Sequence, residues 1–234
     1  MLPIYCALDT TDLGRASQMA RMLAPHIAGI KLGLEFFTYH GPQGVTAIAQ
    51  HNIPIFLDLK FHDIPNTVAG ALRSALSLNV QMITVHTSGG KDMLTRAADT
   101  VSNWCEQYQR VPPQLLGVTI LTSMDALNLR QIGMNEVVEE QVLRLATLAK
   151  ECGLDGVVCS PHEIGLLRMA LGNELLLVVP GIRPEGSETG DQKRVLTPAQ
   201  ALALGANYLV IGRPITEATD PIHILKTIEK TLAC

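Results

Sequence analysis

Eight short apolar runs, each followed by a segment with helical spacing, constrain the fold of this 234-residue chain more than any other feature. Each run is almost continuously hydrophobic and contains β-branched residues, which is typical of parallel strands that are buried on both faces. Strands and helices that alternate in this way indicate the α/β class. The predicted strands span residues 4–9, 28–33, 53–60, 82–87, 115–121, 156–160, 175–181 and 208–213.

The segments between these runs carry helix signals. Residues 136–151 place their aliphatic side chains on one stripe and their charged side chains elsewhere, as an amphipathic helix does. Asp220 before Pro221 combines an N-cap residue with a proline at the first helical position. Gly153 and Gly205 close two helical patterns just before the next strand, where a left-handed cap is expected.

Eight strand–helix units in succession favour one closed (β/α)8 TIM barrel over an open doubly wound sheet. No Gly-x-Gly-x-x-Gly motif follows the first predicted strand, so the usual signature of a dinucleotide-binding sheet is missing. No linker, low-complexity segment or shift in composition interrupts the series. We therefore expect residues 1–234 to form a single barrel domain.

Composition and charge exclude several classes of protein. With 47% apolar residues and a formal net charge of −4, the chain lacks the low hydrophobicity and high charge of disordered proteins. Its apolar runs are far shorter than the roughly 20 residues that a membrane-spanning helix needs. The N-terminus has no pattern typical of a secretory signal, so we expect a cytoplasmic protein without a membrane partner.

Basic residues and cysteines give two further expectations. The 18 Lys and Arg residues are scattered along the chain, so we expect no nucleic-acid partner. The five cysteines form no Cys-x-x-Cys pair, which favours buried reduced thiols over a disulfide or a zinc site.

Polar and charged side chains gather where most of the predicted strands end, and the carboxyl ends of barrel strands are where such folds carry their chemistry. In the third strand, alternation puts Asp58 and Lys60 on the same face, and Asp63 follows within one turn. The second strand contributes Lys31. Two carboxylates and two ammonium groups would then converge, and their opposite signs would make burial tolerable. A structural ion pair at a strand end is the alternative.

The last two strands are followed by residues suited to an anion. The stretch 181–194 is rich in glycine and polar residues and contains Arg183, and the eighth strand ends in Gly212 and Arg213. The loops after strands seven and eight of such barrels commonly hold a phosphate. Together with the charged array, they predict a phosphorylated small-molecule substrate, although a surface loop with incidental arginines is also possible.

No metal site is predicted. The seven histidines lack the His-x-His and His-Glu-x-x-His spacings, and Lys60 between two aspartates competes for the carboxylates that a hard cation needs.

Several segments resemble the orotidine 5'-phosphate decarboxylase family, in particular its bacterial type, over essentially the full length of the chain. The most specific is DLKFHDIPNT at 58–67. The others are ALD at 7–9, IKLG at 30–33, VHTSGG at 85–90, LTS at 121–123, PGIRP at 180–184 and IGRPI at 211–215.

This resemblance implies a homodimeric barrel that converts orotidine 5'-monophosphate, a nucleotide monophosphate, to UMP and CO2 without a cofactor, in the last step of de novo UMP synthesis. Lys60 would donate the proton to C6, flanked by Asp58 and by Asp63 of the partner subunit. Lys31, grouped with these catalytic residues, would also contact the ribose. The remaining substrate-binding positions implied are Asp9 at the ribose, Ile64 and Thr67 near the dimer interface, Thr122 and Ser123 at the base, and Arg183, Gln192, Gly212 and Arg213 at the phosphate.

Two other functions stay open. A metal-dependent 3-hexulose-6-phosphate synthase or a related sugar-phosphate lyase resembles this chain in its Asp-x-Lys-x-x-Asp array, but such enzymes generally carry glutamate where this chain has Lys31. A non-catalytic sensor of a phosphorylated ligand, built on the same barrel, is the third possibility.

Overall fold

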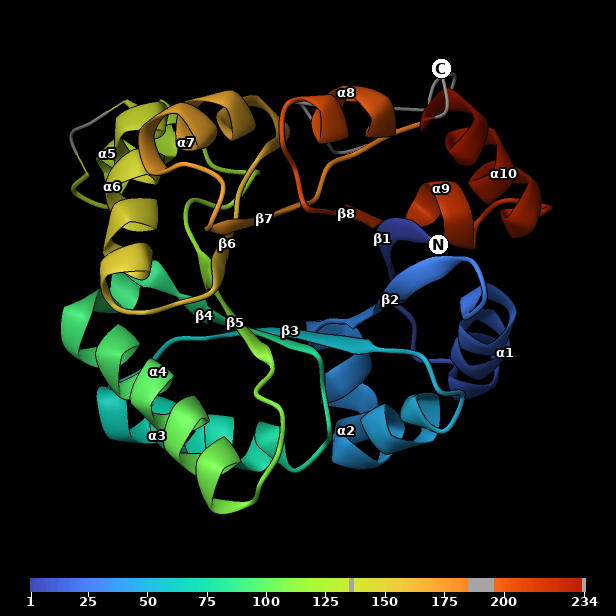
Figure 1. The fold of residues 1–234 in the computed structure, drawn as a ribbon, viewed down its shortest axis with the longest axis horizontal. Coiled ribbons are helices and arrows are strands. Elements are labelled where there is room, and N and C mark those ends of the chain that lie inside the picture. The colour runs from blue at the N-terminus through green and yellow to red at the C-terminus, as the bar shows by residue number, and fades with distance from the viewer. Residues whose placement is uncertain (135–136, 185–195, 233–234) are drawn as a thin grey trace.

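The computed structural model describes residues 1–134, 137–184 and 196–232. Within them, eight parallel strands pair in sequence order and the eighth pairs with the first, so that the sheet closes into a barrel. The strands lie in the middle of Figure 1 and the helices surround them. The (β/α)8 TIM barrel predicted from the sequence is confirmed.

The strands are β1 (Leu2–Ala7), β2 (Ile27–Leu32), β3 (Ile55–Phe61), β4 (Met82–His86), β5 (Gln114–Val118), β6 (Gly156–Val158), β7 (Leu176–Val179) and β8 (Tyr208–Ile211). The α-helices are α1 (Leu13–Leu23), α2 (Leu34–Ala49), α3 (Pro65–Leu76), α4 (Gly90–Gln107), α5 (Ala126–Gln131), α6 (Val138–Glu151), α7 (Ile164–Leu171), α8 (Pro198–Ala203), α9 (Arg213–Thr216) and α10 (Pro221–Leu232). Short 3-10 turns, Thr87–Gly89 and Pro161–Glu163, follow β4 and β6.

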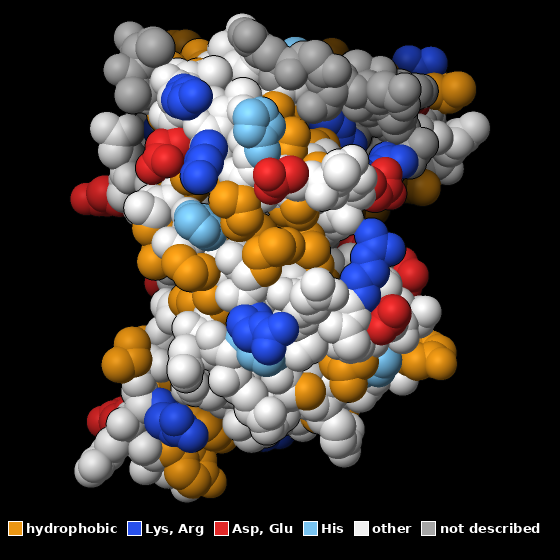
Figure 2. Space-filling model, turned by 90° about the vertical axis from the view of Figure 1, so that its right-hand side faces the viewer, with side chains coloured by type: hydrophobic (Ala, Val, Ile, Leu, Met, Phe, Trp, Pro, Cys, Tyr) orange, Lys and Arg blue, Asp and Glu red, His pale blue; other side chains and the backbone are white. Residues whose placement is uncertain are grey.

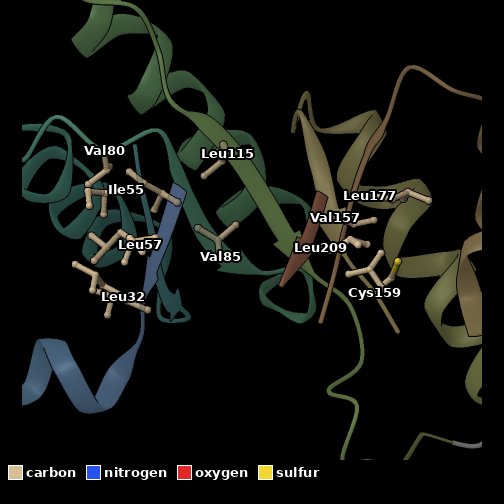
Figure 3. Packing of buried hydrophobic residues seen from close by; sticks show 14 of the residues in the cluster. Leu32, Ile55, Leu57, Val80, Val85, Leu115, Val157, Cys159, Leu177 and Leu209 are labelled. Atoms are coloured by element: carbon tan, nitrogen blue, oxygen red, sulfur yellow. The ribbon is translucent and has the colours of Figure 1, made fainter. Parts of the chain in front are cut away.

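Hydrophobic side chains fill two separate layers. The larger layer lies between the outer face of the strands and the helices, and Figure 3 shows part of it, including Ile55 and Leu57 of β3. The smaller layer fills the inside of the barrel and includes Phe56 of β3 and Val210 of β8. Because side chains alternate along a strand, Asp58 continues the inward-facing series that Phe56 begins.

The helix ends confirm the predicted caps. Gly153 and Gly205 have φ angles of 79° and 108°, in the left-handed region that glycine adopts without a side-chain clash. The Asp220 carboxylate accepts a hydrogen bond from the His223 N–H at 3.0 Å, as an N-cap side chain does.

Several predicted strands extend further at their carboxyl ends than the strands of the structure do. The predicted strand 115–121 ends at Val118, and the predicted strand 208–213 ends at Ile211. Hydrophobic residues continue past the end of the hydrogen-bonded ladder because the first loop residues still pack against the barrel, as Ile120 does. Strand ends therefore cannot be located from hydrophobicity alone.

The four described cysteines are buried, as predicted, and the space-filling view in Figure 2 shows how charged side chains are distributed on one face. On the face in Figure 2, Lys and Arg side chains lie interspersed with Asp and Glu rather than in one continuous patch. Cys6, Cys105, Cys152 and Cys159 are buried and free, while Cys234 lies outside the described residues. None of the described helices combines the length and the apolar character that crossing a bilayer requires.

Candidate active site

The carboxyl end of β3 brings Asp58 and Lys60 together. The Lys60 Nζ donates a hydrogen bond to Asp58 Oδ2 at 2.7 Å, the length expected of a charge-assisted bond. Asp58 is buried, with 7% of its surface exposed, whereas the Lys60 side chain keeps 27% of its surface accessible. The ammonium therefore faces the mouth of the barrel while its partner carboxylate lies beneath it.

Lys31, from the neighbouring strand β2, completes the array. It is paired in register with Phe56 of β3, which directs its side chain toward the same inner face as Asp58. Its Nζ lies 3.6 Å from Asp58 Oδ2 and 3.5 Å from Asp9 Oδ1. A Cβ at Gly33 would lie 2.9 Å from this Nζ, so a larger residue there would displace the ammonium.

The charges around Asp58 decide its protonation state. Burial alone would raise its pKa, but the ammonium groups of Lys31 and Lys60 and hydrogen bonds from Lys60 and Thr84 lower it by more. The net result is an Asp58 pKa below the ordinary value for an aspartate. The site therefore holds a buried, ionised carboxylate between two cations.

The backbone at this point departs from a regular strand. Leu57 pairs with Ile83 and Phe61 with Val85, so β3 makes four residue steps while β4 makes two. Lys60 lies within this bulge with φ of 51°, in the left-handed region that a residue with a side chain rarely adopts. Its backbone N–H donates to the Thr84 Oγ1 of β4 at 2.9 Å.

A cavity of about 220 Å³ opens beside the array. Its polar lining residues are Lys31, Asp58, Lys60 and Thr122, and the rest of its lining is largely apolar. The apolar lining is Phe56, Val118, Ile120, Leu121, Val158, Cys159, Pro180 and Val210. A small ligand that combines apolar surface with a few polar groups fits such a cavity.

A second, smaller cavity of about 120 Å³ is lined mainly by residues that follow β1 and β8, among them Asp9. Arg15 and Arg213 contribute its basic groups. Gly212 and Arg213 follow β8, and the buried Arg183 follows β7. The predicted phosphate-binding positions in the described chain thus sit at the ends of the last two strands, whereas Gln192 lies outside the described residues.

Four predicted site residues lie apart from the array. Asp63, Ile64, Thr67 and Ser123 are exposed, and the Asp63 carboxylate accepts a hydrogen bond from the neighbouring Ile64 N–H at 2.7 Å. The ion pairs formed by the described residues do not include Asp63. The second carboxylate near Lys31 is therefore Asp9 rather than Asp63 of the same chain.

Two residues of β4, neither of them among the predicted site residues, lie near Asp58 and Lys60. Thr84 donates to Asp58 Oδ1 at 3.0 Å, and the His86 ring lies at a tilt beside the His62 ring, with ring centroids 5.5 Å apart. Burial, then electrostatic interactions with His62 and Lys60, lower the pKa of His86 against the opposing effect of Asp58. Their signal was present in the sequence: both follow Met82 at intervals of two, on the inward face of a buried strand.

The described residues contain no cluster of three or more His, Cys, Asp or Glu side chains arranged to hold a metal ion.

Comparison with known proteins identifies the family. The sequence model described as "Orotidine 5'-phosphate decarboxylase / HUMPS family" matches residues 3–228. The chain belongs to this family. A protein from Moorella thermoacetica named orotidine 5'-phosphate decarboxylase is 50% identical over 96% of this chain and 90% of its own length. Its namesake from Paramagnetospirillum magneticum is 47% identical over 98% of each chain.

Solved structures agree with this membership. The crystal structure of orotidine 5'-phosphate decarboxylase from Lactobacillus acidophilus matches with a TM-score of 0.84 and 36% identity, and the match covers 100% of both chains. The resemblance to the orotidine 5'-phosphate decarboxylase family, inferred from segments such as 58–67, is thus confirmed. The roles of individual residues stay predictions.

Proposed function

We propose that this protein decarboxylates orotidine 5'-monophosphate to UMP and CO2 without a cofactor, as the last step of de novo UMP synthesis. Membership of the orotidine 5'-phosphate decarboxylase / HUMPS family supports the reaction class. The observation that carries the proposal is the array at the cavity wall, where the Asp58 carboxylate lies 2.7 Å from Lys60 Nζ and 3.6 Å from Lys31 Nζ.

The chemistry of the reaction explains why an ammonium is needed. When the bond between C6 and the carboxylate breaks, CO2 departs and an electron pair stays on C6 in the plane of the ring. The π system cannot delocalise that pair, so stabilisation must come from a fixed positive charge close to C6. The Lys60 ammonium supplies that charge and then its proton to C6, after which solvent returns a proton to the amine.

Asp58 has two tasks in this mechanism. Its ionised carboxylate pairs with the ammonium groups of Lys60 and Lys31 and fixes the direction of the Lys60 side chain. It also carries negative charge next to the departing carboxylate, which raises the free energy of the bound substrate relative to the transition state. Lys31 and Asp9, whose charged atoms are 3.5 Å apart, hold the ribose hydroxyls.

The phosphate supplies binding energy far from C6. Arg183, Gln192, Gly212 and Arg213 bind it, after the last two strands of the barrel. Because the electron pair on C6 is not delocalised, the uncatalysed reaction is very slow. Its transition state must be stabilised by on the order of 20 kcal/mol, which is more than one lysine provides. Contacts with the phosphate therefore help to hold the substrate against the rigid array.

The pyrimidine occupies the cavity of about 220 Å³, with Thr122 and Ser123 holding its polar edge. Asp63, Ile64 and Thr67 act across a homodimer interface, where the partner subunit's Asp63 completes the array at Lys60. Their exposure in the single chain supports this arrangement.

One assay separates the proposal from its rivals. The protein is incubated with orotidine 5'-monophosphate and excess EDTA, and the loss of substrate absorbance is followed. We expect turnover that EDTA does not diminish. Turnover that appears only after magnesium is added would contradict the cofactor-free mechanism, and saturable binding of UMP without turnover would favour a sensor.

A further inference from the structure

Thr84 joins the backbone of Lys60 to the carboxylate of Asp58. Its Oγ1 accepts the Lys60 N–H at 2.9 Å and donates its own proton to Asp58 Oδ1 at 3.0 Å. The other oxygen of Asp58 accepts from Lys60 Nζ at 2.7 Å. These three hydrogen bonds form a closed ring, which connects the backbone N–H of Lys60 through Thr84 and Asp58 to the ammonium group of the same lysine.

This ring accounts for two unusual features of the site. Lys60 adopts a left-handed φ of 51° inside the β3 bulge, and such a conformation persists only where the surroundings hold it. The bulge also removes the Lys60 N–H from the regular ladder, so that the N–H needs another acceptor. The Thr84 hydroxyl is that acceptor, and it comes from the adjacent strand rather than from the bulge itself.

The hydroxyl also fixes the orientation of Asp58. A hydroxyl has a single proton, and here it is directed at Oδ1. Oδ2 is then left to face both Lys60 and Lys31. Thr84 is completely buried, so water cannot substitute for its hydroxyl without rearrangement of the strands.

We propose that Thr84 is a positioning residue, whose hydroxyl holds the Lys60 backbone and the Asp58 carboxylate in the arrangement that turnover requires. Thr84 does not line the cavity, so it acts through Asp58 and Lys60 rather than by touching the substrate. This inference rests on the proposed function, because positioning matters only if Lys60 acts on a bound substrate.

The test compares Thr84→Val with Thr84→Ser and with a matched control. Valine keeps the shape of threonine but can neither accept from Lys60 nor donate to Asp58, whereas serine keeps both hydrogen bonds. The control is Thr87→Val: Thr87 is equally buried and its hydroxyl donates to the Val118 carbonyl at 2.7 Å. Thr87 therefore reports on the loss of a buried threonine hydroxyl outside the ring.

We expect Thr84→Val to lower kcat by about 10²-fold, because a displacement of a reacting group by about 1 Å has an effect of that size. KM should change much less, because the phosphate and base contacts lie elsewhere. Thr84→Ser should restore kcat to within about threefold of wild type, and Thr87→Val should leave it within the same range. The acid limb of the pH profile should move to higher pH in Thr84→Val, since Asp58 loses a hydrogen bond to its ionised form.

Other results would overturn the inference. If Thr84→Val and Thr87→Val lower the urea midpoint to a similar extent and both keep the wild-type kcat, the Thr84 hydroxyl is only structural. If Thr84→Val fails to fold, Thr84→Cys replaces it, since cysteine is close to threonine in volume but its thiol is only a weak hydrogen-bonding group. Equal kcat values for the cysteine and serine variants would then contradict the positioning role.

The inference and the proposed function fail in different ways. If the wild-type protein does not decarboxylate orotidine 5'-monophosphate, the proposed function is wrong whatever the variants do. If wild-type turnover is present and Thr84→Val matches it, only the positioning role is wrong. A crystal structure of Thr84→Val reads out the Lys60 φ and the Asp58 rotamer independently of activity, and unchanged values of both would also overturn the inference.

Discussion

At the scale of single residues, Lys60 is fixed at both ends. Its ammonium bonds to Asp58 and its backbone N–H bonds to Thr84, while its left-handed φ leaves it little freedom to relax. A charge that is already in place when the substrate arrives requires no reorganisation during the reaction. The backbone conformation of Lys60 is thus as relevant to the proposed mechanism as its charge.

Replacing Lys60 tests that mechanism. Lys60→Ala removes both the positive charge near C6 and the proton, so we expect turnover to fall by on the order of 10⁴-fold. The fold should persist because Asp58 keeps Lys31 as a partner at 3.6 Å. Steady-state kinetics and circular dichroism measure the two effects, with Lys226→Ala, an exposed lysine of α10, as control. Wild-type turnover in Lys60→Ala would refute Lys60 as the proton donor.

His86 is expected to make stability depend on pH. Because burial, His62 and Lys60 lower its folded-state pKa, the unfolded chain binds a proton that the folded protein does not. The free energy of unfolding should then decrease as pH falls below about 6.5, the pKa of an unperturbed histidine. The decrease should continue until the pH reaches the folded pKa. Asp58, with its lowered pKa, adds a loss only at more acidic pH, below about 4.

Urea unfolding at a series of pH values measures this dependence. His86→Gln should give a flatter curve than wild type between neutral pH and about pH 5. His223→Gln replaces an exposed histidine of α10 and should keep the wild-type slope. Parallel curves for wild type and His86→Gln would show that His86 does not contribute to the slope.

Which side chains meet was only partly predictable from the sequence. Alternation along β3 placed Asp58 and Lys60 on one face, and their 2.7 Å contact confirms that they meet. The bulge that contains Lys60 cannot be predicted from the alternation of side chains along β3, because it depends on the pairing of β3 with β4. Alternation also places Thr84 on the inward face of β4, but it does not show that its partners are Asp58 and Lys60 of β3.

At the scale of elements, helix ends and strand ends differ in how well sequence locates them. The left-handed caps at Gly153 and Gly205 were predicted because glycine there satisfies a local backbone requirement. The strand ends were not, since a strand ends where its neighbour ceases to pair, which is a non-local property. Local chemistry therefore located the caps, whereas the β3 bulge required the structure.

Two glycine substitutions test the cap explanation. Gly153 has φ of 79° and a Cβ there would meet no atom within 4 Å, so Gly153→Ala adds backbone strain alone. We expect it to lower the free energy of unfolding by about 1 kcal/mol. Gly165, inside α7, also has open space around its Cα but is not among the positive-φ residues. Gly165→Ala should raise the free energy of unfolding by about 0.5 to 1 kcal/mol.

Urea unfolding of both variants gives the comparison directly. The same chemical change should have opposite signs at the two positions, which separates backbone conformation from the effect of an added methyl group. Destabilisation by Gly165→Ala as large as that by Gly153→Ala would contradict the explanation.

At the scale of the whole molecule, the single chain leaves part of the predicted site exposed. Asp63 and Thr67 face solvent, and 67% of the apolar Ile64 is accessible. These residues belong to the segment 58–67 that also supplies Asp58 and Lys60. A chain segment that is buried at one end and exposed at the other fits a site that a second subunit completes, since an interface would cover Ile64.

Hybrid dimers test whether Asp63 acts across that interface. In a dimer of one Lys60→Ala and one Asp63→Ala subunit, action in trans leaves one site with both replacements and the other with neither. Random exchange makes about half of the dimers hybrid, so about a quarter of all sites should regain wild-type turnover. The measurement mixes the two inactive proteins under conditions where exchange is verified by mass-labelled subunits. Each protein mixed with unlabelled copies of itself is the control, and exchange without recovery would assign Asp63 to the site of its own chain.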